Sequence, residues 1–401
     1  MPQLKTFQHP SLSQVTLTRG EGSYLYDDAG QRYVDLLSGT WCCALGHNHP
    51  RLVAVLQEQL PRLVHLNAVF SSREIEMATE RLTALLPASL DRVTWVNTGS
   101  EAVELALKLA RLTSGDGAVV VWERGYYGAT NLASSLSQGG GGGWCEPVTW
   151  RVPAPHCTKC PQDSSYPGCD FRCLDLALAG VTHAAAVLYE PLLAVGGVIV
   201  PPEGYGLRVQ EWARRLGALF ILEEVTTGMG RTGRWFGFQH DNLEPDVLVL
   251  GKVLGNGLPV AAVVATEDVE QRCEGRMRHV QSHQNDPWSG AVAAMVIQIL
   301  KEERLVQRSA DLGRQLLGWL EELEHHWRVV AEARGLGLVA ALEFADAGMG
   351  EQLRGYLFKQ GIIVDYQETT RCLRFFPPYV LEEQDLARAV ELIEQGIRSL
   401  A

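Results

Sequence analysis

The middle of the chain alternates between short apolar runs and segments whose apolar residues recur at helical spacing. The apolar runs lie at 93–96, 118–121, 184–189, 218–222, 246–250 and 260–265, and the helical patterns lie at 100–112 and 207–216. Short, continuous apolar runs indicate strands that are buried on both faces of a sheet. Their alternation with helices predicts an α/β fold with a mainly parallel sheet flanked by helices.

The segments on either side of this region follow other patterns. They predict a hairpin at 24–35, helices at 51–60, 72–86 and along 289–325, and an α+β arrangement over the rest of the chain. Residues 137–175 interrupt the alternation with a five-glycine run and a stretch rich in proline and cysteine. We expect a long loop or insertion there.

Charge and hydropathy exclude several classes of protein. The 401 residues carry a formal net charge of −12 without a visible basic stripe, so nucleic-acid binding is not expected. There is no apolar stretch of about 18 residues and no signal-peptide pattern at the start, so we expect neither a membrane span nor export. The nine cysteines are an odd number, which argues against a disulfide framework. A soluble, cytoplasmic protein is the expectation.

The segment NTGSEA, residues 97–102, lies between a predicted strand and a predicted helix. Gly99 lets the backbone approach a ligand closely, and Ser100 offers a hydroxyl and a free N–H at the start of the helix. Such a turn suits a phosphate group. A plain helix cap explains the same residues, because Thr, Ser and a following Glu also cap helices well.

Two polar groups follow apolar runs further along the chain. Glu223 comes directly after 218–222, and the carboxyl end of a parallel strand faces a ligand crevice. Lys252 follows 246–250, with glycines on both sides. Burial there disfavours the charged amine and makes it a better nucleophile toward an aldehyde. The alternatives are an acid that meets solvent and a lysine that reaches the surface.

Phosphate turn, acid and lysine are the three groups that a pyridoxal phosphate (PLP) site needs. The turn would hold the phosphate, and Glu223 would keep the pyridine nitrogen protonated. Lys252 would bind the aldehyde as a Schiff base and then carry a proton at the substrate Cα. Together they predict PLP as the cofactor.

Over nearly its whole length the sequence resembles the class III aminotransferases of PLP fold type I. The matching segments are LGHNHP (45–50), 97–111, GYYG (125–128), EP (190–191), EEVTTGMGRTG (223–233), PDVLVLGKVLGNGLP (245–259), SHQNDP (282–287) and LRFFPP (373–378). SHQNDP and EPLLAVGG (190–197) are most similar to dialkylglycine decarboxylase, a decarboxylating member of the class. The resemblance implies a large PLP-binding domain at 46–296 that contains the insertion. It also implies a small C-terminal domain at 297–401, with residues 1–45 packed against it.

The resemblance also implies a role for each matching residue. For the cofactor, it implies that Gly99 and Ser100 contact the phosphate, that Tyr126 and Val225 contact the two ring faces, and that Thr226 lies near the ring hydroxyl. It further implies that Ser282 contacts the phosphate of the neighbouring subunit and that Arg374 binds the substrate carboxylate. The part given to Ser282 implies a homodimer with shared active sites. Trp41 is expected to line the substrate pocket, and a plain core position is the alternative.

Several positions depart from the family pattern. Glu223 stands where the family usually has Asp, and Thr226 stands where it has Gln. Many members that use ω-amino donors have a Glu that covers the substrate arginine, and Val195 occupies that position. We therefore expect Glu223 to keep its role and Arg374 to remain free for carboxylates. Thr40 replaces a Gln of the decarboxylase, which weakens the case for decarboxylation.

The reaction implied is a ping-pong transfer of an amino group from an amino acid or amine donor to an α-keto acid, by way of Lys252. The alternative is another PLP reaction on the same fold: decarboxylating transamination, racemisation or a lyase step. No metal is expected at the active site.

Four cysteines lie close together in the insertion, at positions 157, 160, 169 and 173. Four thiolates could hold a zinc ion or an iron–sulfur cluster, and reduced free thiols are the alternative. The spacing is not that of a common zinc ribbon. A metal-stabilised binding protein without activity is the alternative outside enzymes, and the intact Lys252 argues against it.

Overall fold

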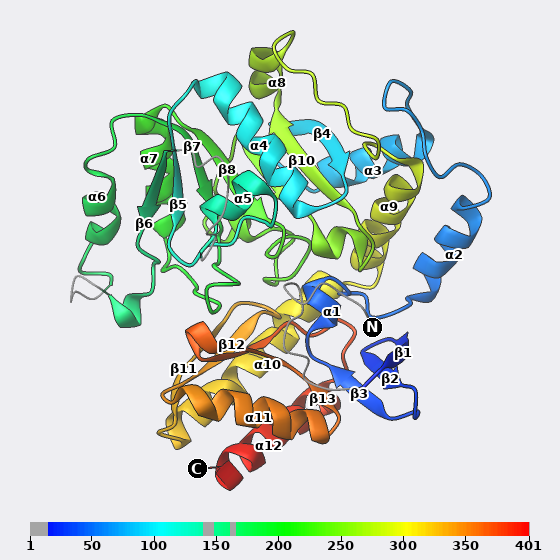
Figure 1. Ribbon diagram of the computed structural model, residues 1–401, viewed down its shortest axis with the longest axis vertical. Coiled ribbons are helices and arrows are strands. Elements are labelled where there is room, and N and C mark those ends of the chain that lie inside the picture. Colours follow the sequence, from blue (N-terminus) through cyan, green and yellow to red (C-terminus); the bar gives the residue numbers. More distant parts are fainter. Residues whose placement is uncertain (1–14, 139–147, 161–165, 401) are drawn as a thin grey trace.

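The computed structural model describes residues 15–138, 148–160 and 166–400 (Figure 1). Its centre is a seven-stranded sheet of order β4-β10-β9-β8-β7-β5-β6. Strand β10 is antiparallel to both of its neighbours, and the other neighbouring strands pair in parallel. The strands are β4 (Leu90–Val96), β5 (Ala118–Trp122), β6 (Thr149–Val152), β7 (Ala184–Tyr189), β8 (Leu219–Glu224), β9 (Val247–Leu250) and β10 (Ala261–Thr266). The predicted α/β class is confirmed.

Both faces of this sheet are buried. Along β5, Val119 and Val121 pack in one apolar cluster with helix α4, whereas Val120 and Trp122 pack in another with α7 and α9. This two-sided burial explains why the strands appear in the sequence as continuous apolar runs. The helices around the sheet are α2 (Pro50–Gln59), α3 (Arg73–Thr83), α4 (Gly99–Ser114), α5 (Asn131–Leu136), α6 (Arg172–Leu178), α7 (Tyr205–Leu216), α8 (Glu267–Cys273) and α9 (Pro287–Glu302).

Strands β1 to β3 and the C-terminal segments from α10 onward lie together in the lower part of Figure 1. Strands β1 (Leu17–Glu21), β2 (Tyr24–Asp27) and β3 (Arg32–Asp35) form a sheet whose fourth strand is β13 (Ile362–Ile363), parallel to β3. A second, antiparallel sheet has the order β11-β12-β15-β14. Its strands and the nearby helices are α10 (Leu305–His326), β11 (Val330–Gly335), β12 (Ala340–Phe344), α11 (Ala347–Lys359), β14 (Asp365–Gln367), β15 (Cys372–Phe375) and α12 (Glu383–Leu400). The domain boundaries given above stay a prediction.

Two sequence predictions need correction. The helical stretch 289–325 is two helices, α9 and α10, because Arg304 adopts a left-handed conformation with φ of 53°. Neither Gly nor Pro marks this break. The insertion 137–175 is not only a loop, since its residues 149–152 form the edge strand β6 beside β5. The five glycines and residues 161–165 lie outside the described residues.

No helix in the described ranges is both long enough and apolar enough to cross a membrane.

Candidate active site

A cavity of about 480 Å³ lies at the carboxyl ends of β8 and β9. It is lined by Thr40, Trp41, Cys42, Asn97, Thr98, Gly99, Ser100, Tyr126, Tyr127, Gly128, Val195, Glu223, Val225, Lys252, Gly257, Leu258, Pro259 and Val260. Most of the predicted site residues therefore share one cavity. The exceptions are Thr226, Ser282 and Arg374, which are not among the lining residues.

The turn that opens α4 leaves two backbone donors for a ligand. Thr98 accepts a hydrogen bond from the N–H of Glu101, and the Glu101 carboxylate accepts from the N–H groups of Asn97 and Thr98. The N–H groups of Gly99 and Ser100 follow in the first helical turn, where a helix offers them no acceptor. The cap therefore leaves these two donors available for an anion, and the two explanations of NTGSEA are not exclusive.

Gly99 is required by packing. A Cβ atom at this position would lie 2.8 Å from both methyl carbons of Val225. The turn and the Val225 side chain thus approach each other as closely as a glycine allows. Gly128, on the same cavity wall, is similar, because its Cβ would lie 2.7 Å from the hydroxyl oxygen of Ser100.

Two carboxyl groups are buried at or near the cavity: Glu223 lines it, and Glu190 is close enough for the charge of Glu223 to affect its pKa. Burial raises the pKa of Glu223 to about 7, although the Lys252 ammonium acts in the opposite direction. Burial also raises the pKa of Glu190 well above its usual range, and the charge of Glu223 adds to this. Glu190 accepts a hydrogen bond of 2.8 Å from the backbone N–H of Tyr126. Glu190 therefore positions the loop that carries the aromatic ring.

Lys252 is held in an unusual backbone conformation directly after β9. Its φ is 43°, in the left-handed region that a lysine rarely adopts. Its amine donates a hydrogen bond of 2.8 Å to the hydroxyl of Thr226, the residue predicted near the cofactor ring. Burial lowers the pKa of Lys252, while the carboxylate of Glu223 partly restores it. A lysine in such a setting is a reactive amine.

The cavity suits a flat, anionic aromatic cofactor. Tyr126 lines the cavity and is 39% exposed, so it offers an aromatic ring on which a flat group could stack. Val225 offers a small aliphatic surface, and the turn at Gly99 offers N–H donors for a phosphate. Lys252 supplies the amine that an aldehyde requires. These residues fit PLP.

The carboxylate of Asp35 shapes the segment that leads to Trp41. Asp35 accepts hydrogen bonds from the N–H groups of Leu37 and Gly39, at 2.8 and 2.9 Å, and contacts His47 at 2.7 Å. These bonds shape the short helix α1 (Ser38–Trp41), which ends at Trp41. Trp41 lines the cavity, and its ring centre lies 4.1 Å from that of Phe376, so it also packs in the core. Its role in the substrate pocket stays a prediction.

Arg374 is not free, contrary to expectation. Its guanidinium donates two hydrogen bonds to Asp365 and one of 3.2 Å to the backbone oxygen of Val195. Arg374 was expected to be free because Val195 replaces the Glu that covers the arginine in other members. The acid that pairs with Arg374 is Asp365, which lies elsewhere in the sequence. Asp365 lies on the neighbouring strand, opposite Arg374.

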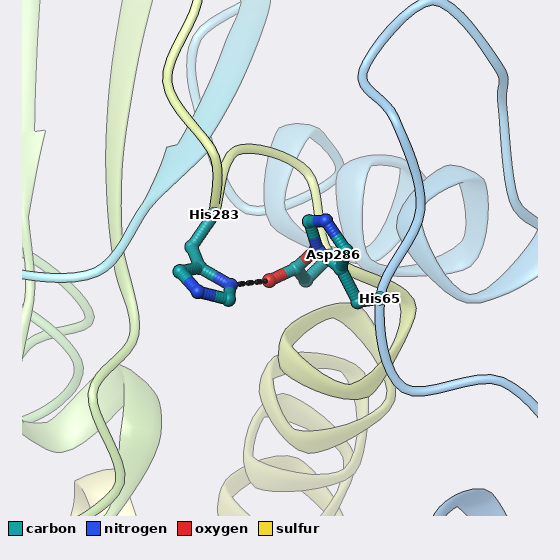
Figure 2. Close-up of side chains that lie close together, drawn as sticks. All are labelled: His65, His283 and Asp286. Carbon is teal, nitrogen blue, oxygen red and sulfur yellow. Dashed lines mark hydrogen bonds and ion pairs between the residues drawn. The ribbon is translucent and has the colours of Figure 1, made fainter.

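Ser282 is exposed and lies in the loop before α9. Figure 2 shows the neighbouring cluster, in which the His65 and His283 rings both face Asp286 at the start of α9. The Nδ1 atoms of the two histidines lie 2.6 and 2.8 Å from different oxygens of the Asp286 carboxylate. The Asn97 side chain donates to the His283 carbonyl at 2.9 Å. The cluster therefore anchors the Ser282 loop beside the turn at residues 97–102.

Cys157, Cys169 and Cys173 of the insertion have free thiols. Within the described ranges, the groups whose possible metal-ligand atoms lie within 4.8 Å of one another are His65–His283–Asp286 and His156–Glu332–Glu343. Neither contains a cysteine. Between Cys157 and Cys160, Lys159 forms an ion pair with Glu343 on β12. This pair and the contact of His156 with Glu332 tie the start of the cysteine segment to the C-terminal sheet.

Sequence reasoning missed several residues that shape the site. Glu190 belonged to a matching segment but received no role, and Asp35 and Asp365 were not singled out. Glu190 and Asp365 act through contacts with residues distant in sequence or across a sheet, and Asp35 binds two nearby N–H groups and the more distant His47. A signal was present for Glu190 only, since an acid directly after the apolar run 184–189 resembles the arrangement at Glu223.

The chain is similar to known proteins over almost its full length. The family model for class-III aminotransferases matches residues 7–397. Acetylornithine aminotransferase of Methanothermobacter thermautotrophicus is 33% identical over 96% of this chain and 94% of the relative. Mitochondrial alanine–glyoxylate aminotransferase 2 of Pongo abelii is 33% identical over 84% of this chain and 70% of the relative.

Solved structures agree with this. A thermostable omega transaminase variant from Pseudomonas jessenii superposes with a TM-score of 0.91 at 28% identity, covering 100% of this chain and 97% of that one. The family model and the relatives lead to the same conclusion as the residues that line the cavity. The chain belongs to the class III aminotransferases, enzymes that use PLP to transfer amino groups.

Proposed function

We propose that Lys252 moves the proton at the donor Cα in this aminotransferase. One observation carries the proposal: Lys252 and Glu223 line the same cavity, where burial lowers the pKa of the amine and raises that of the carboxyl. A lowered pKa leaves a larger share of the amine neutral at a given pH. A neutral amine can take a proton from carbon and return it to another atom.

The other residues hold and orient. When bound, PLP supplies an aldehyde that takes up the amino group and a ring that withdraws electrons from the donor carbon. Thr226 keeps the Lys252 amine in place, and Glu223 would hold a proton on the ring nitrogen. The remaining contacts would come from Gly99 and Ser100 to the phosphate and from Tyr126 and Val225 to the two faces of the ring.

A ping-pong order is part of the proposal. The donor and the α-keto acid both need to reach Lys252, which lines the cavity. The product of the donor would therefore leave before the acceptor binds. A carboxylate on either substrate would bind Arg374 in place of Asp365.

A homodimer is part of the proposal. Ser282 is exposed in the single chain, and large apolar side chains are exposed nearby, including Val69 at 80% and Phe70 at 64%. A second copy of the chain would cover such a surface. Light scattering after size-exclusion chromatography tests this, and a monomer at micromolar concentration contradicts it.

The function is tested with a panel of amino donors against pyruvate and 2-oxoglutarate. We expect the keto or aldehyde product of the donor to form in equal amount with the amino product of the acceptor, without release of carbon dioxide. The variant Lys252→Ala should bind PLP without the visible absorbance of the lysine-bound form and lose turnover. Carbon dioxide released in equal amount would show the decarboxylating alternative, and normal turnover by Lys252→Ala would refute the assignment.

A further inference from the structure

The guanidinium of Arg374 is already paired with a carboxylate of its own chain. Asp365 on β14 lies opposite Arg374 on the antiparallel strand β15. The Nε of Arg374 donates to Oδ2 of Asp365 at 2.7 Å, and Nη2 donates to the same oxygen. The two side chains are 9% and 26% exposed. A substrate carboxylate that is to bind Arg374 must therefore compete with Asp365.

Trp41 separates this pair from the cavity. The Trp41 ring centre lies 5.0 Å from Cζ of Arg374 and 5.1 Å from Nζ of Lys252. Trp41 and Val195 are lining residues, whereas Arg374 and Asp365 are not. Lys252 is the one cationic side chain among the described residues that line the cavity. A substrate group at this end first meets an indole and an aliphatic side chain.

We propose that Asp365 determines the substrate class of this site by competing with substrate carboxylates for Arg374. The inference rests on the proposed function, since it concerns the substituent that the donor carries beside its reacting amino group. With the pair intact, Arg374 is neutralised and the site accepts donors with an uncharged group at this end. A carboxylate is accepted only when it displaces Asp365.

The geometry favours movement of the acid over movement of the arginine. Arg374 is almost fully buried, and its third contact, to the backbone of Val195, is independent of Asp365. Asp365 keeps about a quarter of its side-chain surface in solvent, so it can give up Arg374 and be hydrated. Removing the charge of Asp365 leaves a buried, unpaired guanidinium, which favours an anionic partner and disfavours an apolar one.

The test compares L-alanine with isopropylamine, which replaces the carboxylate with a methyl group. Each is reacted with the PLP-loaded enzyme, and the loss of the visible cofactor absorbance gives kcat/KM for the half-reaction. We expect Asp365→Asn to raise the alanine-to-isopropylamine ratio about ten-fold or more, by a lower KM for alanine and a higher one for the amine. A ratio within two-fold of the wild type overturns the proposal.

Two variants control for charge and for the arginine. Glu368 is exposed and lies three positions after Asp365 in the sequence. Glu368→Gln removes its negative charge and should leave the alanine-to-isopropylamine ratio unchanged. Arg374→Gln combined with Asp365→Asn should abolish the increase. If Asp365→Asn does not fold by circular dichroism, Asp365→Ser replaces it. An equal increase in the Glu368→Gln variant would show a general charge effect and overturn the proposal.

A binding experiment separates this inference from the proposed function. Calorimetry measures the affinity of the PLP-loaded enzyme for propionate and for its uncharged counterpart propionamide. Asp365→Asn should increase the affinity for propionate about ten-fold and leave the affinity for propionamide unchanged. If neither donor reacts with any variant, the proposed function fails, and the propionate result still decides the inference about Asp365. Equal affinities in wild type and variant overturn it.

Discussion

The amine of Lys252 donates a hydrogen bond of 2.8 Å to the hydroxyl of Thr226, a residue at the end of the neighbouring strand. The bond fixes the amine at the point where β8 and β9 both end. The strained backbone at Lys252, with φ of 43°, is thus combined with a defined side-chain position. Reactivity at this site depends on the position of the amine as well as on its pKa.

Removing the Thr226 hydroxyl should slow the reaction of Lys252 with PLP. In Thr226→Val the amine loses its acceptor, worth about 1 kcal/mol, and we expect an approximately five-fold loss in the rate of cofactor uptake. The acceptor stabilises the protonated amine most, so the low-pH limb of this rate should move to lower pH. Stopped-flow absorbance after adding PLP to the apoenzyme measures both effects, and Thr226→Ser should behave as the wild type.

The charge of Glu223 should matter for turnover more than for cofactor binding. In Glu223→Gln we expect kcat to fall about 10²- to 10³-fold, because no anion holds the ring proton. The visible absorbance of the lysine-bound cofactor should still form. Glu223→Asp keeps the charge and serves as the control. A kcat for the Gln variant within three-fold of the wild type contradicts the role given to Glu223.

Close packing at Gly99 predicts a variant and its rescue. In Gly99→Ala the new Cβ would lie 2.8 Å from the Val225 methyl carbons, so the turn must move. Overpacking of this kind costs about 1–3 kcal/mol, and we expect PLP affinity to fall at least ten-fold. The double variant Gly99→Ala/Val225→Ala should recover most of it. Fluorescence titration with PLP measures the affinity of each variant. A double variant that binds PLP no more tightly than Gly99→Ala refutes the packing explanation.

The His47–Asp35 contact predicts a pH dependence of stability. Burial alone would lower the pKa of His47, but hydrogen bonds to Asp35 and Cys43 outweigh it and raise the pKa from 6.5 to about 9. A pKa raised on folding stabilises the protein below pH 6.5 and loses this effect as the pH rises through about 9.

The measurement is the melting temperature of wild type and His47→Gln from pH 6 to pH 10. The melting temperature of the wild type should exceed that of the variant most at pH 6, and this difference should shrink as the pH rises through about 9. A difference that grows with pH would show the opposite sign of linkage.

Local patterns in the sequence predicted much of the fold and the central part of the site. The buried strands, the turn at Gly99 and the residues Glu223 and Lys252 are each encoded within a few positions, so their pattern is visible without a structure. The break at Arg304 is not, because a left-handed residue other than Gly leaves no mark in hydrophobic spacing. The partner of Arg374 depends on the register of β14 and β15, and no spacing in the sequence gives that register.

The pairing of β3 with β13 joins strands that are more than 300 residues apart in the chain. During translation, residues 32–35 leave the ribosome long before their partners at 362–363 have been made. Trp41 follows β3 and lines the cavity, and Phe376, on which Trp41 stacks, follows β13, so this side of the cavity cannot be completed co-translationally. The nascent enzyme must carry an unfinished active site until synthesis is almost complete, and late, non-local closure of this kind is slow.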